Sequence, residues 1–311
     1  MILLALLASY GKVALLLLPV FTCASVGAVW AVKKNSYPGE FISVLVTTVA
    51  TPALVFHTLV TTRLNDALLL QVLAAALLGL ALMALIATIL LRLAQLPVLA
   101  LVPTATFPNT GNLGLPLAQL AFGDTGLAVA VTFFAICSLV QHTLGVWLLG
   151  WARQESPTQR QAWPRGVVIA SIAAVGLRLA DLSVPEPVLS SARLVGSLTV
   201  PLMLLSLGYA LATVSRSGIG RGSLVGLIRL GSGAAAGVIV TSLLNLPPLA
   251  AGVLVLQLLM PVAVVSYLYA DRYTSVGEIS AGAILFSTAL FVLLSPLLLW
   301  WAGAASLVPV P

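Results

Sequence analysis

The segment that decides how this chain folds is TFPNTGNLGLP, residues 106–116. It holds two prolines, two glycines and two asparagines, yet it lies within an apolar stretch as long as a membrane-spanning helix. Proline removes one backbone hydrogen bond from a helix and clashes with the carbonyl one turn earlier. A helix through this segment is therefore predicted to break near Pro108.

The composition of the whole chain indicates the solvent in which this break lies. Of the 311 residues, 60% are hydrophobic and 7% are charged, whereas a soluble domain carries about 25% charged residues. A soluble chain of this size cannot hide so much apolar surface, so the sequence predicts an integral membrane protein. The net charge of +6 fits basic cytoplasmic loops, and we expect no nucleic-acid partner.

Ten apolar stretches are long enough to cross a bilayer, which takes about 20 residues each. They run over 10–32, 38–61, 67–91, 96–119, 125–151, 164–180, 187–213, 222–245, 247–270 and 277–302. The first lacks the basic start of a signal peptide, so it is interpreted as a membrane helix. The polar stretch 153–165 separates the fifth span from the sixth. The predicted fold is all-α, with one five-helix repeat in residues 1–155 and a second, inverted repeat in 156–311.

The basic residues predict the orientation of these spans, because Lys and Arg concentrate in cytoplasmic loops. With both termini outside the cell, the inner loops hold Lys33, Lys34, Arg92, Arg153, Arg160, Arg165, Arg216, Arg221 and Arg272. The outer loops and ends hold only Lys12, Arg63, Arg178 and Arg193. We therefore expect a multi-pass protein of the cell (inner) membrane with the N-terminus and the C-terminus outside.

Prolines at matching places in the two halves point to a duplication. Pro52 and Pro201 lie 149 residues apart, and Pro108 and Pro261 lie 153 residues apart. Because five spans per half is an odd number, the second repeat must be inverted relative to the first. Interrupted helices in corresponding positions of two halves mark the binding site of a transporter. Spans four and nine are thus predicted to be broken and to cross at Pro108 and Pro261.

The break in span four also predicts what the site binds. It exposes the N-terminus of a half-helix, whose free N–H groups and dipole favour an anion. Side-chain amides add donors, and Gly111 and Gly114 would let another backbone approach closely. Span nine has Val262 where span four has Asn109, so it is expected to supply shape and backbone groups. The predicted substrate-binding residues are Pro108, Asn109, Thr110, Gly111, Asn112, Gln257, Pro261, Val262, Ser266 and Tyr267.

Three ionisable residues inside the spans are candidates for a proton or charge role. Arg229 lies well within span eight, where an ionisable residue is by default a functional hypothesis; the alternative is a partner for a helix C-terminus or a lipid headgroup. His57 and His142 titrate near neutral pH, although a histidine in a helix is more often a packing residue. The acidic residues lie near loops or span ends, so no carboxylate relay is visible. Uniport and proton or sodium coupling stay open.

Catalysis is the first competing interpretation. The sequence has no His-Glu-x-x-His motif, no Gly-x-Ser-x-Gly motif and no paired aspartates within a span. Cys23 and Cys137 lack the spacing of a zinc site or a disulfide framework. We therefore predict a protein that is not an enzyme and that uses no metal or cofactor.

Several motifs together resemble one family. FPNTGNLGLPL (107–117) resembles the fourth-span motif of the auxin efflux carrier family, which includes bacterial members and the plant PIN-type carriers. LLMPVAVVSYLYADRY (258–273) is similar to its ninth span. ATPALVF (50–56), VPLMLLSLGYALA (200–212) and Arg229-Leu230 resemble its second, seventh and eighth spans. The large hydrophilic central loop of the plant carriers is missing.

The resemblance implies a fold shared with the bile-acid sodium symporters. It implies a scaffold of spans 1, 2, 6 and 7, a transport domain of spans 3–5 and 8–10, and an elevator-type movement between them. It also implies homodimers and transport of a small organic acid, with Asn109 at the substrate carboxylate. A sodium-coupled organic-anion symporter of the bile-acid type is the nearest alternative, and it would need acidic and carbonyl oxygen ligands near the crossing.

Overall fold

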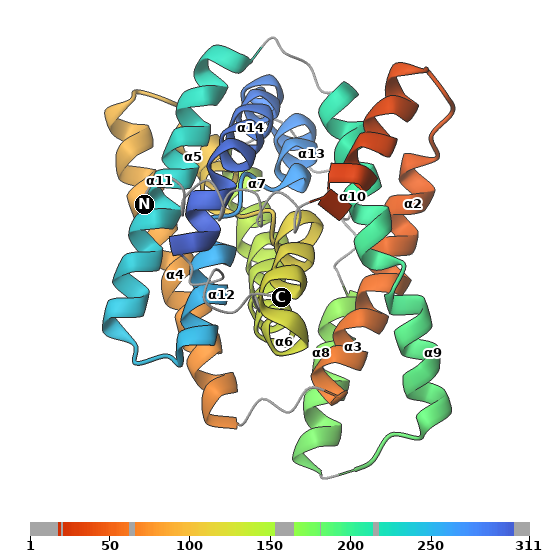
Figure 1. Ribbon diagram of the computed structural model, residues 1–311. Helices are drawn as coiled ribbons and strands as arrows, with labels where there is room; N and C mark the ends of the chain where they lie inside the picture. The colour runs from red at the N-terminus through yellow and green to blue at the C-terminus, as the bar shows by residue number, and fades with distance from the viewer. Residues whose placement is uncertain are drawn as a thin grey trace, which may run out of the picture.

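The computed structural model describes residues 18–19, 21–61, 66–152, 165–180, 182–213 and 218–301. Helices account for nearly all regular structure in these ranges, and the only β-pairing among them is one isolated bridge. The predicted all-α class agrees with this arrangement (Figure 1). The first part of the predicted span 10–32 and the repeat boundary at 155/156 lie outside the described residues.

The first half of the chain contains a helix over 21–32 and then a run of helical segments. These are α2 (Gly39–Leu45), η1 (Val46–Ala50), α3 (Thr51–Thr61), α4 (Asp66–Leu93), α5 (Val98–Thr106), η2 (Thr110–Gly114), α6 (Leu115–Val140), η3 (Gln141–Gly145) and α7 (Val146–Ala152). The η segments are π-helical turns, and η1 directly precedes Pro52. A π-turn adjusts a helix locally where proline cannot donate its hydrogen bond.

The second half consists of seven helices in the described ranges. They are α8 (Arg165–Leu179), α9 (Glu186–Gly196), α10 (Thr199–Thr213), α11 (Ile219–Leu243), α12 (Pro248–Leu258), α13 (Val264–Tyr273) and α14 (Gly277–Trp301). α12 and α13 are the two parts of the predicted span nine, and the segment between them is not helical.

The chain reverses direction within α6. Gly123 has φ 66° and ψ −162°, which is non-helical and accessible mainly to glycine. On a straight helix Thr110 and Cys137 would lie about 40 Å apart at 1.5 Å per residue, yet their side chains share a hydrogen bond. Gly111 lies against the ring of Phe134 in the same way. Residues 110–122 and 124–152 therefore form a hairpin with its turn at Gly123.

Five helices of the described chain are long and apolar enough to cross a membrane. The ten predicted spans are thus confirmed only in part, and part of the difference has a physical reason. The breaks after Thr106 and Leu258 divide two spans into half-helices of 9 and 11 residues, and about 20 residues are needed to cross. Both arms of the hairpin at Gly123 belong to one of the five, a helical stretch of 43 residues.

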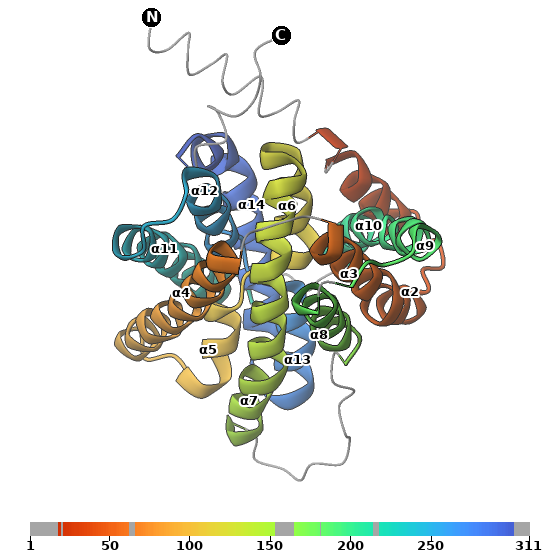
Figure 2. The ribbon, with the colours of Figure 1, turned by 90° about the horizontal axis from the view of Figure 1, so that it is seen from below.

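The helices pack in two groups (Figures 1 and 2). In one, α3 packs on α8 and α9, and α10 packs on α2. Helix 21–32 belongs to this group, since Gly27 and Gly208 bring its backbone against that of α10 at Leu205 and Ala24. In the other, α4, α5, α6 and α11–α14 pack on one another, with α7 on α5 and α13. α3 and α10 meet the second group at α6 and η2.

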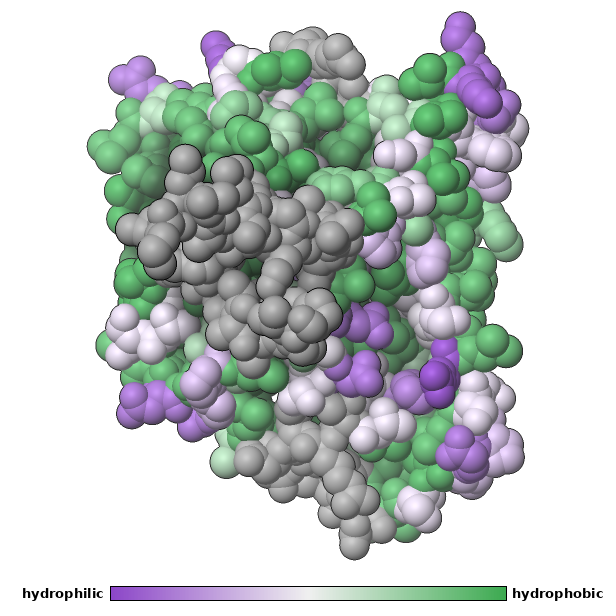
Figure 3. Space-filling view, in the orientation of Figure 1, coloured by the Kyte–Doolittle hydropathy of each residue, from purple (hydrophilic) through white to green (hydrophobic). Residues whose placement is uncertain are grey.

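The outside of the molecule is apolar where a soluble protein would be polar. On α4, Leu70, Leu77 and Leu85 are 63%, 47% and 57% exposed, and apolar residues cover much of the face drawn in Figure 3. Such surface is stable against lipid and costly in water. The multi-pass membrane protein predicted from composition is consistent with this surface.

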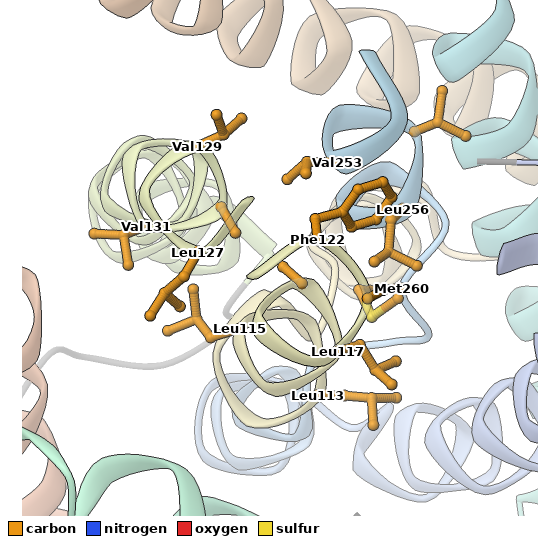
Figure 4. Close-up of a cluster of buried hydrophobic side chains, with 14 of the residues drawn as sticks. Leu113, Leu115, Leu117, Phe122, Leu127, Val129, Val131, Val253, Leu256 and Met260 are labelled. Atoms are coloured by element: carbon orange, nitrogen blue, oxygen red, sulfur yellow. The ribbon is translucent and has the colours of Figure 1, made fainter. Parts of the chain in front are cut away.

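The interior near the hairpin is a continuous apolar core. It combines side chains from η2, from both arms of α6 and from α12 (Figure 4). Its labelled members are Leu113, Leu115, Leu117, Phe122, Leu127, Val129, Val131, Val253, Leu256 and Met260. This core joins the hairpin to the first half of span nine, and it fixes where the two breaks meet.

Candidate functional site

The two broken helices meet through their backbones. Pro108 and Val262 form an antiparallel bridge. The N–H of Asn109 donates to the carbonyl of Pro261 at 2.8 Å, and the N–H of Ala263 donates to the carbonyl of Phe107 at 3.1 Å. Backbone groups freed in a helix break are costly in an apolar interior unless they are satisfied. The two breaks satisfy part of each other's backbone, so both are needed to form the crossing.

The register of the bridge differs by one residue from a pairing of the two prolines. The comparison of the two halves equated Asn109 with Val262, one residue after each proline. In the antiparallel bridge Pro108 lies opposite Val262, so Asn109 lies opposite Pro261 and Phe107 lies opposite Ala263. The crossing is polar on the side of span four and apolar on the side of span nine.

Asn109 lies at the start of the second half of span four. Its side chain is 4% exposed and makes no capping hydrogen bond to the following helix. Among the described residues its Nδ2 has no hydrogen-bond partner. A buried amide donor without a partner is unfavourable. An acceptor oxygen of a ligand would satisfy it.

The first turn after Asn109 supplies backbone donors. The N–H groups of Leu113 and Gly114 donate to the Asn109 carbonyl at 3.3 and 3.1 Å. The carbonyl of Pro108 accepts from Thr110, and that of Phe107 accepts from Ala263. The first N–H groups of a helix have no partner within it, and those of Gly111 and Asn112 are in this position. Thr110 is buried, and Asn112 is half-buried.

Gln257 connects span nine to this half-helix. It is fully buried, and its Nε2 donates to the carbonyl of Gly114 at 2.9 Å. Its Oε1 has no partner within the described part of the chain. A Cβ at position 114 would collide with this amide. The expectation that Gly111 and Gly114 admit another backbone is therefore wrong: they admit side chains, those of Phe134 and Met203 at Gly111 and that of Gln257 at Gly114.

The remaining predicted residues of span nine contact side chains of other helices. The N–H of Val262 donates to Ser287 Oγ at 3.1 Å. Ser266 is buried and accepts from Gln141 Nε2 at 3.4 Å. Tyr267 is half-buried and packs against an apolar cluster of α5, α11 and α14 residues. Sequence reasoning missed Ser287 and Gln141, although both are polar residues within apolar spans.

Arg229 is fully buried in α11 and caps the first half of span nine. Its Nη2 donates to the carbonyl of Leu258, the last residue of α12, at 2.9 Å. Gly233, one turn along α11, leaves room for this contact, because a Cβ there would collide with the Leu258 carbonyl. Nε and Nη1 of Arg229 have no partner in the described ranges. The predicted alternative role, a partner for a helix C-terminus, is thus present.

One histidine lies away from the crossing, and the side chain of the other lies outside the described residues. His57 is half-buried on α3, and its nearest charged groups include Arg193 and Glu186 on α9. It belongs to the first packing group and not to the crossing. The side chain of His142, in η3, lies outside the described residues. No group of three or more His, Cys, Asp or Glu side chains suited to a metal ion occurs in the described part of the chain.

Comparison with known proteins agrees with this geometry. The model of the membrane transport protein family matches residues 13–164 and 158–300. The chain is also 28% identical, over 202 residues, to a protein named uncharacterized transporter MJ1031 from Methanocaldococcus jannaschii. That alignment covers 62% of this chain and 64% of the relative, so the chain spans less than two thirds of the relative's length. The family predicted from the motifs is confirmed, and the chain belongs to the membrane transport protein family, which is auxin efflux carrier-like.

Proposed function

We propose that the protein is a secondary transporter that carries a small organic anion, an auxin-like monocarboxylate or a mono- or dicarboxylate, across the cell membrane. The observation that carries the proposal is the crossing of the two broken helices. There the Nδ2 of buried Asn109, which has no partner in the described ranges, lies at a half-helix N-terminus whose first N–H groups have no partner within the helix. All of these groups are donors, and a carboxylate is an acceptor on both oxygens.

The chemistry of this site suits transport better than permanent binding. A helix N-terminus carries about half a positive charge and favours an anion. Backbone and amide donors contact the carboxylate through hydrogen bonds that can break again, so the ligand can leave. The polar residues Thr110, Asn112, Gln257, Ser266 and Tyr267 line or support the same crossing in the proposal, and no catalytic step is needed.

Alternating access is proposed to occur by an elevator-type movement. The two packing groups support this proposal, because the crossing belongs wholly to the group of α4–α7 and α11–α14. That group would be the transport domain, and the group containing α2, α3 and α8–α10 would be the scaffold. In this proposal residues 1–155 and 156–311 form two inverted five-helix repeats, lipid surrounds the molecule, and the scaffold mediates a homodimer. Both termini lie outside, as the basic residues predict.

A sodium-coupled symporter of the bile-acid type is the second candidate. One observation favours it: Gln257 Oε1 is a buried oxygen without a partner in the described ranges, and sodium prefers oxygen ligands. Against it, no acidic residue has been found beside the crossing in that part of the chain. Removing sodium from both sides of the membrane separates the candidates, since only the symporter would lose transport.

The proposal is tested with purified protein in liposomes. We expect uptake of at least one radiolabelled acid from a panel of acetate, lactate, indole-3-acetate, malonate and malate. Asn109→Ala should reduce this uptake at least tenfold, because the loss of a hydrogen bond to a charged group costs about 1.5–3 kcal/mol. Asn245→Ala, at an exposed asparagine between α11 and α12, is the matched control. Normal uptake by Asn109→Ala would refute the assigned site.

A further inference from the structure

We propose that Arg229 is the fixed positive charge that balances the substrate carboxylate, so that the loaded site is neutral and the empty site is cationic. This inference rests on the proposed function and deepens it. It identifies the group that selects anions over neutral isosteres, and it identifies the step of the transport cycle that responds to the membrane potential.

The first reason is that the charge of Arg229 is buried without a full counter-charge. The side chain is 0% exposed and makes one hydrogen bond, to a backbone carbonyl. No acidic side chain pairs with it among the described residues. The C-terminus of α12 offers about half a negative charge, which offsets the guanidinium only in part. A buried charge without a partner is strongly unfavourable, and a carboxylate would supply the missing half.

The second reason is the position of the guanidinium at the crossing. Leu258, whose carbonyl it contacts, is the last helical residue before the break that holds Pro261. Arg229 also lies within electrostatic range of Cys137. Cys137 in turn shares a hydrogen bond with Thr110, the neighbour of Asn109. Leu258 and Cys137 thus connect the guanidinium to both broken helices.

The third reason is that capping of α12 does not account for all the donor groups of Arg229. A helix C-terminus needs one donor, and Nη2 provides it. Nε and Nη1 are then buried without partners in the described chain. Asn109 Nδ2 and Thr106 Oγ1, beside the break in span four, are also buried without a partner in those ranges. Burying so many unmade donors is unfavourable, and a carboxylate accepts from several at once.

The proposed charge balance has a consequence for voltage. A site that moves through the membrane with Arg229 and a monocarboxylate carries no net charge, whereas the empty site carries +1. One elementary charge moved across 100 mV changes a population ratio by about 50-fold. Exchange uses only the loaded site, so it is insensitive to voltage. Net transport needs the return of the empty site, so it is sensitive.

The experiment measures exchange of a radiolabelled monocarboxylate in proteoliposomes at 0 and −100 mV. The probe is whichever of acetate, lactate and indole-3-acetate the wild-type protein takes up fastest, with its carboxamide as the neutral competitor. We expect wild-type exchange to change less than twofold with voltage. Wild-type exchange that falls several-fold with voltage would overturn the inference without any variant. Absence of uptake for every acid of the panel would instead refute the proposed function.

Variants then assign the charge to Arg229. In Arg229→Gln the loaded site carries −1, so exchange should become voltage-sensitive by several-fold, and the preference for carboxylate over carboxamide should fall at least tenfold. Arg229→Lys keeps the charge and should keep both wild-type properties, whereas loss of a merely structural cap in Arg229→Gln would leave the voltage dependence of exchange unchanged. Arg221→Gln removes an equal charge from the exposed start of the same helix and should resemble wild type. A voltage-insensitive Arg229→Gln protein, or a voltage-sensitive Arg229→Lys protein, contradicts the proposal.

Discussion

Single residues at the crossing are held by contacts between distant parts of the chain. Gly114 and Gln257 are separated by 143 residues, yet the Gln257 amide occupies the space where any side chain at position 114 would lie. The absence of a side chain at one position therefore determines where the amide of the other can bind. The effect of a substitution at either position therefore depends on the other residue of the pair as well as on the residue type.

Gly114→Ala should lower both thermal stability and transport. The new Cβ would collide with the Gln257 amide, and inserting a methyl into a packed interior costs about 1–3 kcal/mol. The measurement is the unfolding temperature of the purified protein in detergent, alongside uptake in liposomes. The double variant Gly114→Ala/Gln257→Ala should recover part of the lost stability. A double variant whose losses simply add would show that the two residues do not interact.

At the scale of elements, the hairpin within α6 depends on one backbone conformation. Gly123 has φ 66°, and a Cβ built there meets no atom within 4 Å. Any effect of a side chain at this position is therefore a backbone effect and not a clash. Because the hairpin brings the second arm of α6 back along the first, the turn also determines which residues surround η2.

Gly123→Ala is expected to destabilise the protein by about 1–3 kcal/mol, the cost of forcing a non-glycine residue into this region. Thermal unfolding in detergent measures the change. Gly231→Ala is the matched control, since Gly231 lies within α11 with open space around it. Alanine there should be neutral or stabilising, because glycine in a helix interior costs about 1 kcal/mol. Equal effects at both positions would argue against the hairpin.

At the scale of the whole molecule, the seam between the two packing groups is the feature that matters most. Met203 on α10 lies against Gly111 of η2, so one group touches the other at the candidate site. A movement of one group past the other would have to slide over this contact. In the proposed movement the site would therefore lie at the surface where the two groups slide past each other.

Met203→Trp should block transport while leaving the protein folded. Phe134 already lies in the space beside Gly111, so the larger side chain would press on it and would wedge the two groups. Uptake in liposomes should fall at least tenfold with an unfolding temperature near that of wild type. Leu194→Trp, at a site that is 74% exposed, controls for the added bulk. Full transport by Met203→Trp would mean that this seam does not move.

Features that depend on local chemistry follow from residue type. The runs of apolar residues predicted most helices of the described ranges to within a few residues, but not the interruption between α9 and α10 inside the predicted span 187–213. Pro108 and Pro261 predicted both breaks, because proline has no N–H wherever it lies. The amides and the half-helix N-terminus predicted an anion site at span four, which stays a prediction until transport is measured.

Features that depend on how distant segments meet could not be predicted from residue type. These are the one-residue shift that pairs Pro108 with Val262, the side chains that fill the space at Gly111 and Gly114, and the contact of Arg229 with Leu258. No periodicity or composition encodes them, because each depends on the relative placement of helices that are joined only through packing. Residue type determines where a helix can break, and packing determines which groups the broken ends contact.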